Sequence, residues 1–189
     1  YQIRLTRYYA SLMKPEAACP IRLQAIPALS EDDPLLPEWA RQLSQEIYGR
    51  PVPWHADAIG DVSKLAAPRL THRYENRAIL HLSSICAVYC RFCFRKSHLN
   101  DDEKTLYDGN LDAAFKYLGE TPGVRELILT GGDPLSLTDA ALARVLDRLE
   151  EIARAQGSLK VVRIHSRMAV TLPSRLTPEL AGILGRKRD

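Results

Sequence analysis

Apolar runs and helical patterns alternate through the second half of the chain. Three short apolar runs have the length and composition of buried strands, at residues 78–84, 125–130 and 159–165. Each is followed by a segment in which apolar residues recur with helical spacing, at residues 108–120, 136–157 and 177–184. A repeated strand–helix order predicts parallel strands joined by right-handed crossovers. We therefore expect an α/β fold.

The longest helical segment carries the clearest pattern. An apolar stripe runs along one of its faces and consists of Leu142, Val145, Leu146, Leu149 and Ile152. Ser136 and Asp139 predict a capping box at its start, and Gly157 predicts a C-cap. In the next helical segment, we expect Thr177 to be the N-cap and Pro178 to occupy the first helical position.

The first 77 residues show a weaker pattern. The stretch "YYASLM" predicts a helical turn, and a longer helix is expected from Pro37 to Gly49. No period is sustained from Arg50 to Tyr74, so this stretch is expected to be a long connection. We accordingly divide the chain into a helical and irregular N-terminal extension, residues 1–77, and an α/β core, residues 78–189.

Composition narrows the class of protein. The chain is 46% hydrophobic and 26% charged, as expected of one ordinary soluble domain. No apolar run reaches the roughly 18 residues of a membrane span, and the start has no signal-peptide core and no Met, so we expect a longer parent chain. A net charge of +3 gives no reason to expect nucleic acid binding. Three of the four cysteines are clustered, which favours thiols held for a metal in the cytoplasm over disulfides.

The clustered cysteines, Cys86, Cys90 and Cys93, follow the first strand with the spacing C-x3-C-x2-C. Thiolates bind zinc, copper(I) or iron–sulfur clusters. A structural zinc site prefers four ligands, and Cys19 lies far away in the sequence. A cubane iron–sulfur cluster can be held by three cysteines, which leaves one iron open. A zinc site and unligated cysteines remain alternative interpretations.

Two further motifs follow the other two strands. Gly131, Gly132 and Asp133 end the second strand, where glycines let a backbone approach a ligand closely and the carboxylate could accept a hydrogen bond from an ammonium group. A tight strand-to-helix turn is the alternative interpretation. Ser166 and Arg167 end the third strand in "RIHSR". All three motifs therefore lie at the C-terminal ends of strands, where parallel α/β folds collect their chemistry.

The stretch "CAVYCRFCFRK" resembles the radical S-adenosyl-L-methionine (SAM) superfamily, whose signature is C-x3-C-x-aromatic-C, here with Phe92 as the aromatic residue. The resemblance implies a partial (β/α) barrel, incomplete in this chain, and a 4Fe-4S cluster whose open iron binds SAM. An external one-electron reductant then allows cleavage of SAM to a 5′-deoxyadenosyl radical. The resemblance places Phe92 near the adenine, the glycine–glycine–aspartate motif near the methionyl amino group, and Ser166 or Arg167 near the ribose or carboxylate.

Several segments resemble the lysine 2,3-aminomutase family more closely, namely "YYASLM", "CPIRLQAIP", "THRYENRAIL", "ELILTGGDPLSL" and "VVRIHSRMAVTLPSRLTPEL". Those enzymes use SAM, the cluster and pyridoxal 5′-phosphate (PLP) to move an amino group from C2 to C3 of an amino acid. The resemblance implies that Arg73 contacts the PLP phosphate and that Arg95 binds the substrate carboxylate. A guanidinium fork suits both groups.

The same resemblance sets a limit and leaves alternatives. The family's PLP-binding lysine and its acidic residues for the substrate side chain lie beyond residue 189, so we expect a fragment or a truncated protein. Lysine is the favoured small-molecule substrate, no nucleic acid or membrane partner is expected, and a homo-oligomer is possible because the family forms multimers. The alternatives are the branch that modifies a lysine for elongation factor P, and a non-catalytic module that binds an iron–sulfur cluster or zinc.

Overall fold

A computed structural model of the chain describes residues 3–27, 57–99 and 106–187, together with the isolated positions 38, 42, 45 and 46. The helix expected from Pro37 to Gly49 therefore lies largely outside the described residues. Within the part that is described, we find no helix with both the length and the apolar character needed to cross a lipid bilayer.

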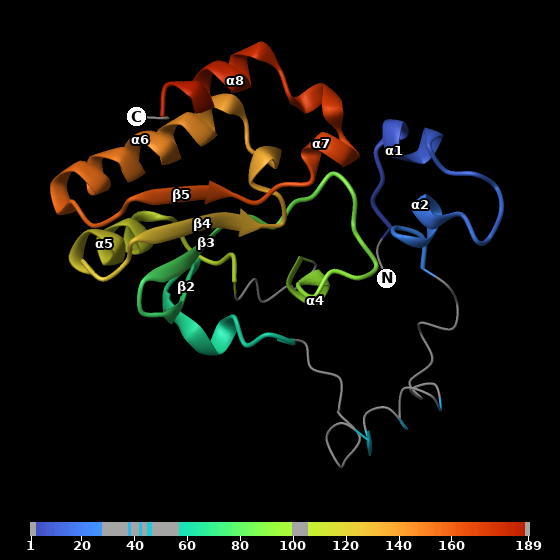
Figure 1. Ribbon diagram of the computed structural model, residues 1–189, viewed down its shortest axis with the longest axis horizontal. Coiled ribbons are helices and arrows are strands. Elements are labelled where there is room, and N and C mark those ends of the chain that lie inside the picture. Colours follow the sequence, from blue (N-terminus) through green and yellow to red (C-terminus); the bar gives the residue numbers. More distant parts are fainter. Residues whose placement is uncertain are drawn as a thin grey trace.

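One open five-stranded sheet organises the fold (Figure 1). The strands follow one another in space in their sequence order, and they are β1 Leu65–Ala67, β2 Leu70–Tyr74, β3 Arg77–Ser83, β4 Glu126–Gly131 and β5 Val161–Ile164. The first three strands pair antiparallel, whereas β3, β4 and β5 pair parallel. The predicted parallel strands are confirmed, because each helical crossover returns the chain to the same end of the sheet.

Three helices pack against one face of this sheet, because their buried side chains join the strands in one hydrophobic cluster. They are α5 Asp112–Glu120, α6 Asp139–Gln156 and α8 Pro178–Gly185. Shorter helical turns lie in the connections, and these are α1 Arg7–Ser11, α2 Pro20–Leu23, η2 Val62–Lys64, α4 Lys96–Leu99, η3 Pro134–Ser136, α7 Met168–Thr171 and η4 Pro173–Arg175. The result is the α/β, partial-barrel architecture that the sequence predicted.

The core follows from the alternation of side chains along the strands. Ala78, Leu80 and Leu82 of β3 are buried in the main hydrophobic cluster with the apolar stripe of α6. His81 and Ser83 alternate with them and belong to the opposite face, which is the inner face of the partial barrel. All five predicted stripe residues of α6 are buried, so the helical pattern is confirmed.

The helix ends agree with the sequence except at one cap. Gly157 has φ 74° and ends α6 in the left-handed conformation, and Thr177 accepts a hydrogen bond from the backbone N–H of Leu180 at the start of α8. The predicted cap at Ser136 is wrong. Ser136 lies in η3, and Thr138 caps α6 instead by accepting from the N–H of Ala141.

The long connection expected from Arg50 to Tyr74 is also wrong in part. It contains β1 and β2, which form a hairpin on the edge of the sheet. Arg69 occupies the turn with φ 64°, and its guanidinium donates to the carbonyls of His81 and Leu82 on β3. These long-range hydrogen bonds hold the hairpin against β3, and no periodic pattern in the sequence predicts them. The division of the chain at residue 77 stays a prediction.

The N-terminal segment packs beside the cysteine loop rather than on the sheet (Figure 1). Tyr9 and Ala25 form a small buried cluster with Val88, which lies between the first two clustered cysteines. Thr6 also donates through Oγ1 to the carbonyl of Thr171 at 2.6 Å, which ties α1 to α7. The segment therefore links the loop after β3 to the loop after β5.

Candidate metal centre

The cysteine loop leaves the C-terminal end of β3 and is held by backbone hydrogen bonds to the N-terminal segment. The N–H of Tyr89 donates to the carbonyl of Arg4 at 3.0 Å, and the N–H of Arg91 donates to the carbonyl of Gln24 at 2.9 Å. The Arg91 guanidinium also donates to the carbonyl of Leu23 at 2.6 Å. These contacts fix the course of a loop that has no regular structure of its own.

Cys86, Cys90 and Cys93 are free thiols, and each is partly buried. Burial raises the pKa of Cys86 to about 12, and the Asp133 carboxylate adds to this shift. Burial also raises the pKa of Cys90, while the Arg167 guanidinium opposes that rise. The free thiols of Cys86 and Cys90 are thus protonated at neutral pH, so metal binding by these two residues must displace protons.

The donor set fits an iron–sulfur cluster. In the described ranges no group of three His, Cys, Asp or Glu side chains is close enough to hold a single metal ion. A cubane cluster spreads its thiolate ligands over separate irons, so three thiols on one loop could bind it without meeting at one point. Cys19, the fourth cysteine, is buried in the N-terminal segment and accepts from the N–H of Lys14.

Gly131 and Gly132 are required by a close approach between two backbones. A Cβ on Gly131 would lie 2.5 Å from the carbonyl oxygen of Ser83, and one on Gly132 would lie 2.5 Å from that of Ile85. Gly131 also has φ 121°, which a side chain would strain. The glycine pair therefore lets the end of β4 pack directly against the start of the cysteine loop, and its expected role beside SAM stays a prediction.

Asp133 is buried and already holds two backbone groups. Its Oδ1 accepts from the N–H of Leu135 at 2.9 Å, and its Oδ2 accepts from the N–H of Arg167 at 2.8 Å. The N–H of Asp133 donates to the carbonyl of Ile85 at 2.8 Å. The residue thus connects the loops after β3, β4 and β5. Each carboxylate oxygen keeps a second lone pair for a further donor.

Arg167 reaches the cysteine loop, whereas Ser166 does not. The guanidinium of Arg167 donates through Nη1 to Cys90 Sγ at 2.5 Å, and its central carbon lies 5.2 Å from the ring centroid of Phe92. Phe92 itself is 63% exposed, so its ring has surface free for a ligand. The Ser166 hydroxyl accepts from the N–H of Met168 at the start of α7.

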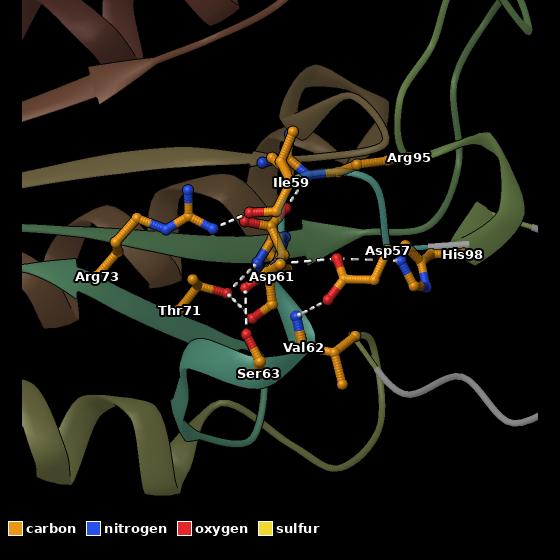
Figure 2. A network of polar contacts seen from close by, with 11 residues as sticks. Asp57, Ile59, Asp61, Val62, Ser63, Thr71, Arg73, Arg95 and His98 are labelled. Atoms are coloured by element: carbon orange, nitrogen blue, oxygen red, sulfur yellow. Dashed lines mark hydrogen bonds and ion pairs between the residues drawn. The ribbon is translucent and has the colours of Figure 1, made fainter. Parts of the chain in front are cut away.

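Arg95 is buried and paired with a carboxylate that the sequence did not single out. Its Nε donates to Oδ2 of Asp61 at 2.7 Å, and the two side chains are only 10% and 3% exposed. The Asp57 carboxylate stabilises the turn that carries Asp61 by accepting hydrogen bonds from the backbone N–H groups of Asp61 and Val62. Figure 2 shows this network, with Asp61 between Arg95 and the strand residue Thr71.

Arg73 lies on the other side of the same segment (Figure 2). It is exposed on β2, and its guanidinium donates to the carbonyl of Ile59. The segment from Asp57 to Ser63 thus separates Arg73 from Arg95. The structure therefore brings together the cysteine loop, Asp133 and Arg167. Of the two predicted substrate and PLP contacts, Arg95 is buried close behind Cys93 in the chain, and Arg73 is exposed on β2.

Three residues of the region were missed by sequence reasoning. They are Asp61, Gln24 and Tyr107. Gln24 accepts from Nη2 of Arg167 at 3.0 Å across 143 residues of chain. The hydroxyl of Tyr107 is buried and has no hydrogen-bond partner among the described residues. Gln24 lies in the family-like segment "CPIRLQAIP", but nothing local connects it with Arg167, and Asp61 and Tyr107 lie in no quoted motif.

The comparison with protein families agrees with this arrangement. The Radical SAM superfamily matches residues 80–186, a range that contains the three cysteines, the glycine pair and Arg167. The chain therefore belongs to the radical SAM superfamily.

Curated relatives narrow the resemblance. The chain is 34% identical to the L-lysine 2,3-aminomutase of Fusobacterium nucleatum, over 97% of this chain and 39% of that protein. It is 30% identical to the glutamate 2,3-aminomutase of Clostridioides difficile, over 95% of this chain and 38% of that protein. It is 36% identical to the L-lysine 2,3-aminomutase of Escherichia coli, over 82% of this chain and 43% of that protein. The chain thus spans about two fifths of the length of these relatives, and the predicted resemblance is confirmed.

Proposed function

We propose that this chain is the cluster- and SAM-binding part of a radical SAM amino acid 2,3-aminomutase. Cys86, Cys90 and Cys93 are the proposed ligands of a 4Fe-4S cluster. When bound and reduced, such a cluster supplies the electron that cleaves SAM to a 5′-deoxyadenosyl radical. One observation carries the proposal: three partly buried free thiols lie on a loop at the C-terminal end of β3, packed directly against the ends of β4 and β5.

The surrounding residues have roles that suit SAM. Phe92 offers an exposed aromatic face to an adenine ring. Asp133 has lone pairs left for the methionyl ammonium group, and its two backbone hydrogen bonds keep its carboxylate in one orientation. Gly131 and Gly132 keep side chains away from the start of the cysteine loop. These four residues would orient the cofactor, and none of them needs to transfer a proton.

The amino migration is the finer part of the proposal. Arg95 is our candidate for the substrate carboxylate: because Asp61 takes its Nε, the two terminal nitrogens can still form a bidentate pair. Arg73 is our candidate for the PLP phosphate, since its guanidinium is exposed on β2. We propose lysine as the substrate, because two of the three relatives described above are named for lysine. An external one-electron reductant is required, and a homo-oligomer stays a prediction.

The test is anaerobic reconstitution of the chain with iron and sulfide, followed by reduction with dithionite in the presence of SAM. We expect the absorption of a 4Fe-4S cluster and formation of 5′-deoxyadenosine. Cys90→Ser should lose both, whereas Cys19→Ser should retain both because Cys19 lies outside the motif. A stable cluster that yields no 5′-deoxyadenosine would refute the catalytic proposal and favour a non-catalytic cluster-binding module. Uptake of zinc in place of iron would refute the cluster itself.

A further inference from the structure

The Arg167 side chain connects the cysteine loop to the N-terminal segment. Its Nη1 donates to Cys90 Sγ at 2.5 Å, and its Nη2 donates to Oε1 of Gln24 at 3.0 Å. The same guanidinium lies over the ring of Phe92, with 5.2 Å between its central carbon and the ring centroid. Three parts of the chain that are far apart in sequence therefore meet at this one cation.

The charge of Arg167 has no acidic partner in the part of the chain that the structure describes. Its side-chain partners there are a sulfur, an amide oxygen and an aromatic face. The Asp133 carboxylate accepts from the backbone N–H of Arg167 and not from the guanidinium. The sulfur in contact with the guanidinium belongs to Cys90, one of the three proposed cluster ligands, so the cation lies directly against the proposed ligand set.

The position of the guanidinium is also fixed from both ends. The backbone of Arg167 is held by Asp133, and its carbonyl accepts from Thr171 Oγ1 at 3.0 Å. Gln24 is itself anchored, because its carbonyl accepts from the N–H of Arg91 in the cysteine loop. Little conformational freedom is left for the side chain, so its contact with Cys90 is part of the fold and not one of many surface rotamers.

We infer that Arg167 tunes the reduction potential of the proposed cluster by donating a charge-assisted hydrogen bond to the Cys90 thiolate, and that Gln24 is a positioning residue for this contact. The inference rests on the proposed function. Reduction by an external one-electron donor adds one negative charge to the cluster. A cationic donor on a ligating sulfur stabilises the reduced form more than the oxidised form, so Arg167 raises the midpoint potential. This assigns Arg167 to the cluster, where the sequence had suggested SAM.

The test is a redox titration of the reconstituted chain, followed by electron paramagnetic resonance in the absence of SAM, so that contacts with SAM cannot contribute. For Arg167→Gln we expect the one-electron reduction equilibrium to become at least tenfold less favourable, a shift of about 59 mV to more negative potential. Arg163→Gln is the matched control. It removes the same charge from a side chain on β5 that is 58% exposed and paired with Glu126, and its potential should equal that of the wild type.

Further variants separate tuning from folding. Gln24→Leu keeps the charge of Arg167 and the hydrogen bond from Arg91 to the backbone of residue 24, but it removes the partner of Arg167 Nη2. We therefore expect a smaller shift of the midpoint potential in the same direction. Arg167→Lys should lie between wild type and Arg167→Gln. Equal potentials for Arg167→Gln and Arg163→Gln would overturn the inference. If Arg167→Gln assembles no cluster, a wild-type potential in Gln24→Leu would overturn it instead. A wild-type chain that takes up no cluster would refute the proposed function itself.

Discussion

The buried pair between Asp61 and Arg95 provides the sharpest test of the fold around the site. Asp61→Ala would leave the Arg95 guanidinium inside the protein without its carboxylate. The change is local, because Asp57 holds the turn through the backbone N–H of residue 61, which alanine retains. The Nε–Oδ2 distance of 2.7 Å and the side-chain exposures of 10% and 3% identify a desolvated pair and not a surface one.

The expected loss follows from that burial. Removing one partner of a buried ion pair costs about 3–5 kcal/mol, because the remaining charge loses its partner but stays away from water. With an m value of about 2 kcal/mol per M, the midpoint of urea unfolding should fall by about 2 M. The matched control is Glu151→Ala on α6, where both side chains of the pair with Arg148 are more than half exposed. That variant should lose less than about 1 kcal/mol.

A double variant distinguishes an unpaired charge from a simple loss of packing. Asp61→Leu combined with Arg95→Met replaces the pair by apolar side chains, and it should recover most of the stability lost in Asp61→Leu alone. Urea unfolding followed by circular dichroism gives all the free energies on one scale. If Asp61→Ala costs no more than Glu151→Ala, the reasoning is refuted, because Arg95 must then reach water or another carboxylate.

Two further predictions concern the glycine pair and the inner face of the sheet. Gly132→Ala should lower the unfolding free energy by several kcal/mol, since its Cβ would lie 2.5 Å from the Ile85 carbonyl oxygen. The control Gly119→Ala, in the open part of α5, should raise the unfolding free energy by about 0.5–1 kcal/mol. Equal changes in melting temperature for the two variants would contradict this prediction. Burial lowers the pKa of His81 to about 3 in the folded protein, compared with about 6.5 in the unfolded chain. Between these two pH values, His81 binds a proton in the unfolded chain but stays neutral in the folded protein. Stability should therefore fall by up to about 1.4 kcal/mol per pH unit from this residue as the pH drops from about 6.5 to about 3, and His81→Gln should reduce that slope. An unchanged slope would show that His81 is already protonated in the folded protein.

The cysteine motif and the order of elements were legible in the sequence because they are local. The apolar stripe of α6 repeats every three or four residues, and its five members are buried as predicted. The spacing of Cys86, Cys90 and Cys93 places three thiols on one loop whatever surrounds it. The local pattern nevertheless predicted the wrong N-cap for α6. Ser136 lies in η3, and its hydroxyl donates to Ser83 Oγ.

The tertiary structure decided what these motifs touch. The partner of Arg95 is 34 residues away, and the amide that holds Arg167 is 143 residues away, so no spacing rule connects either pair. The hairpin of β1 and β2 likewise depends on hydrogen bonds to β3 and not on its own weak pattern. The sequence by itself determined that three thiols follow a buried strand and that parallel strands gather three motifs at one edge. Only the tertiary structure determined that the Arg167 guanidinium contacts the Cys90 thiol, because long-range contacts arise from packing and not from periodicity.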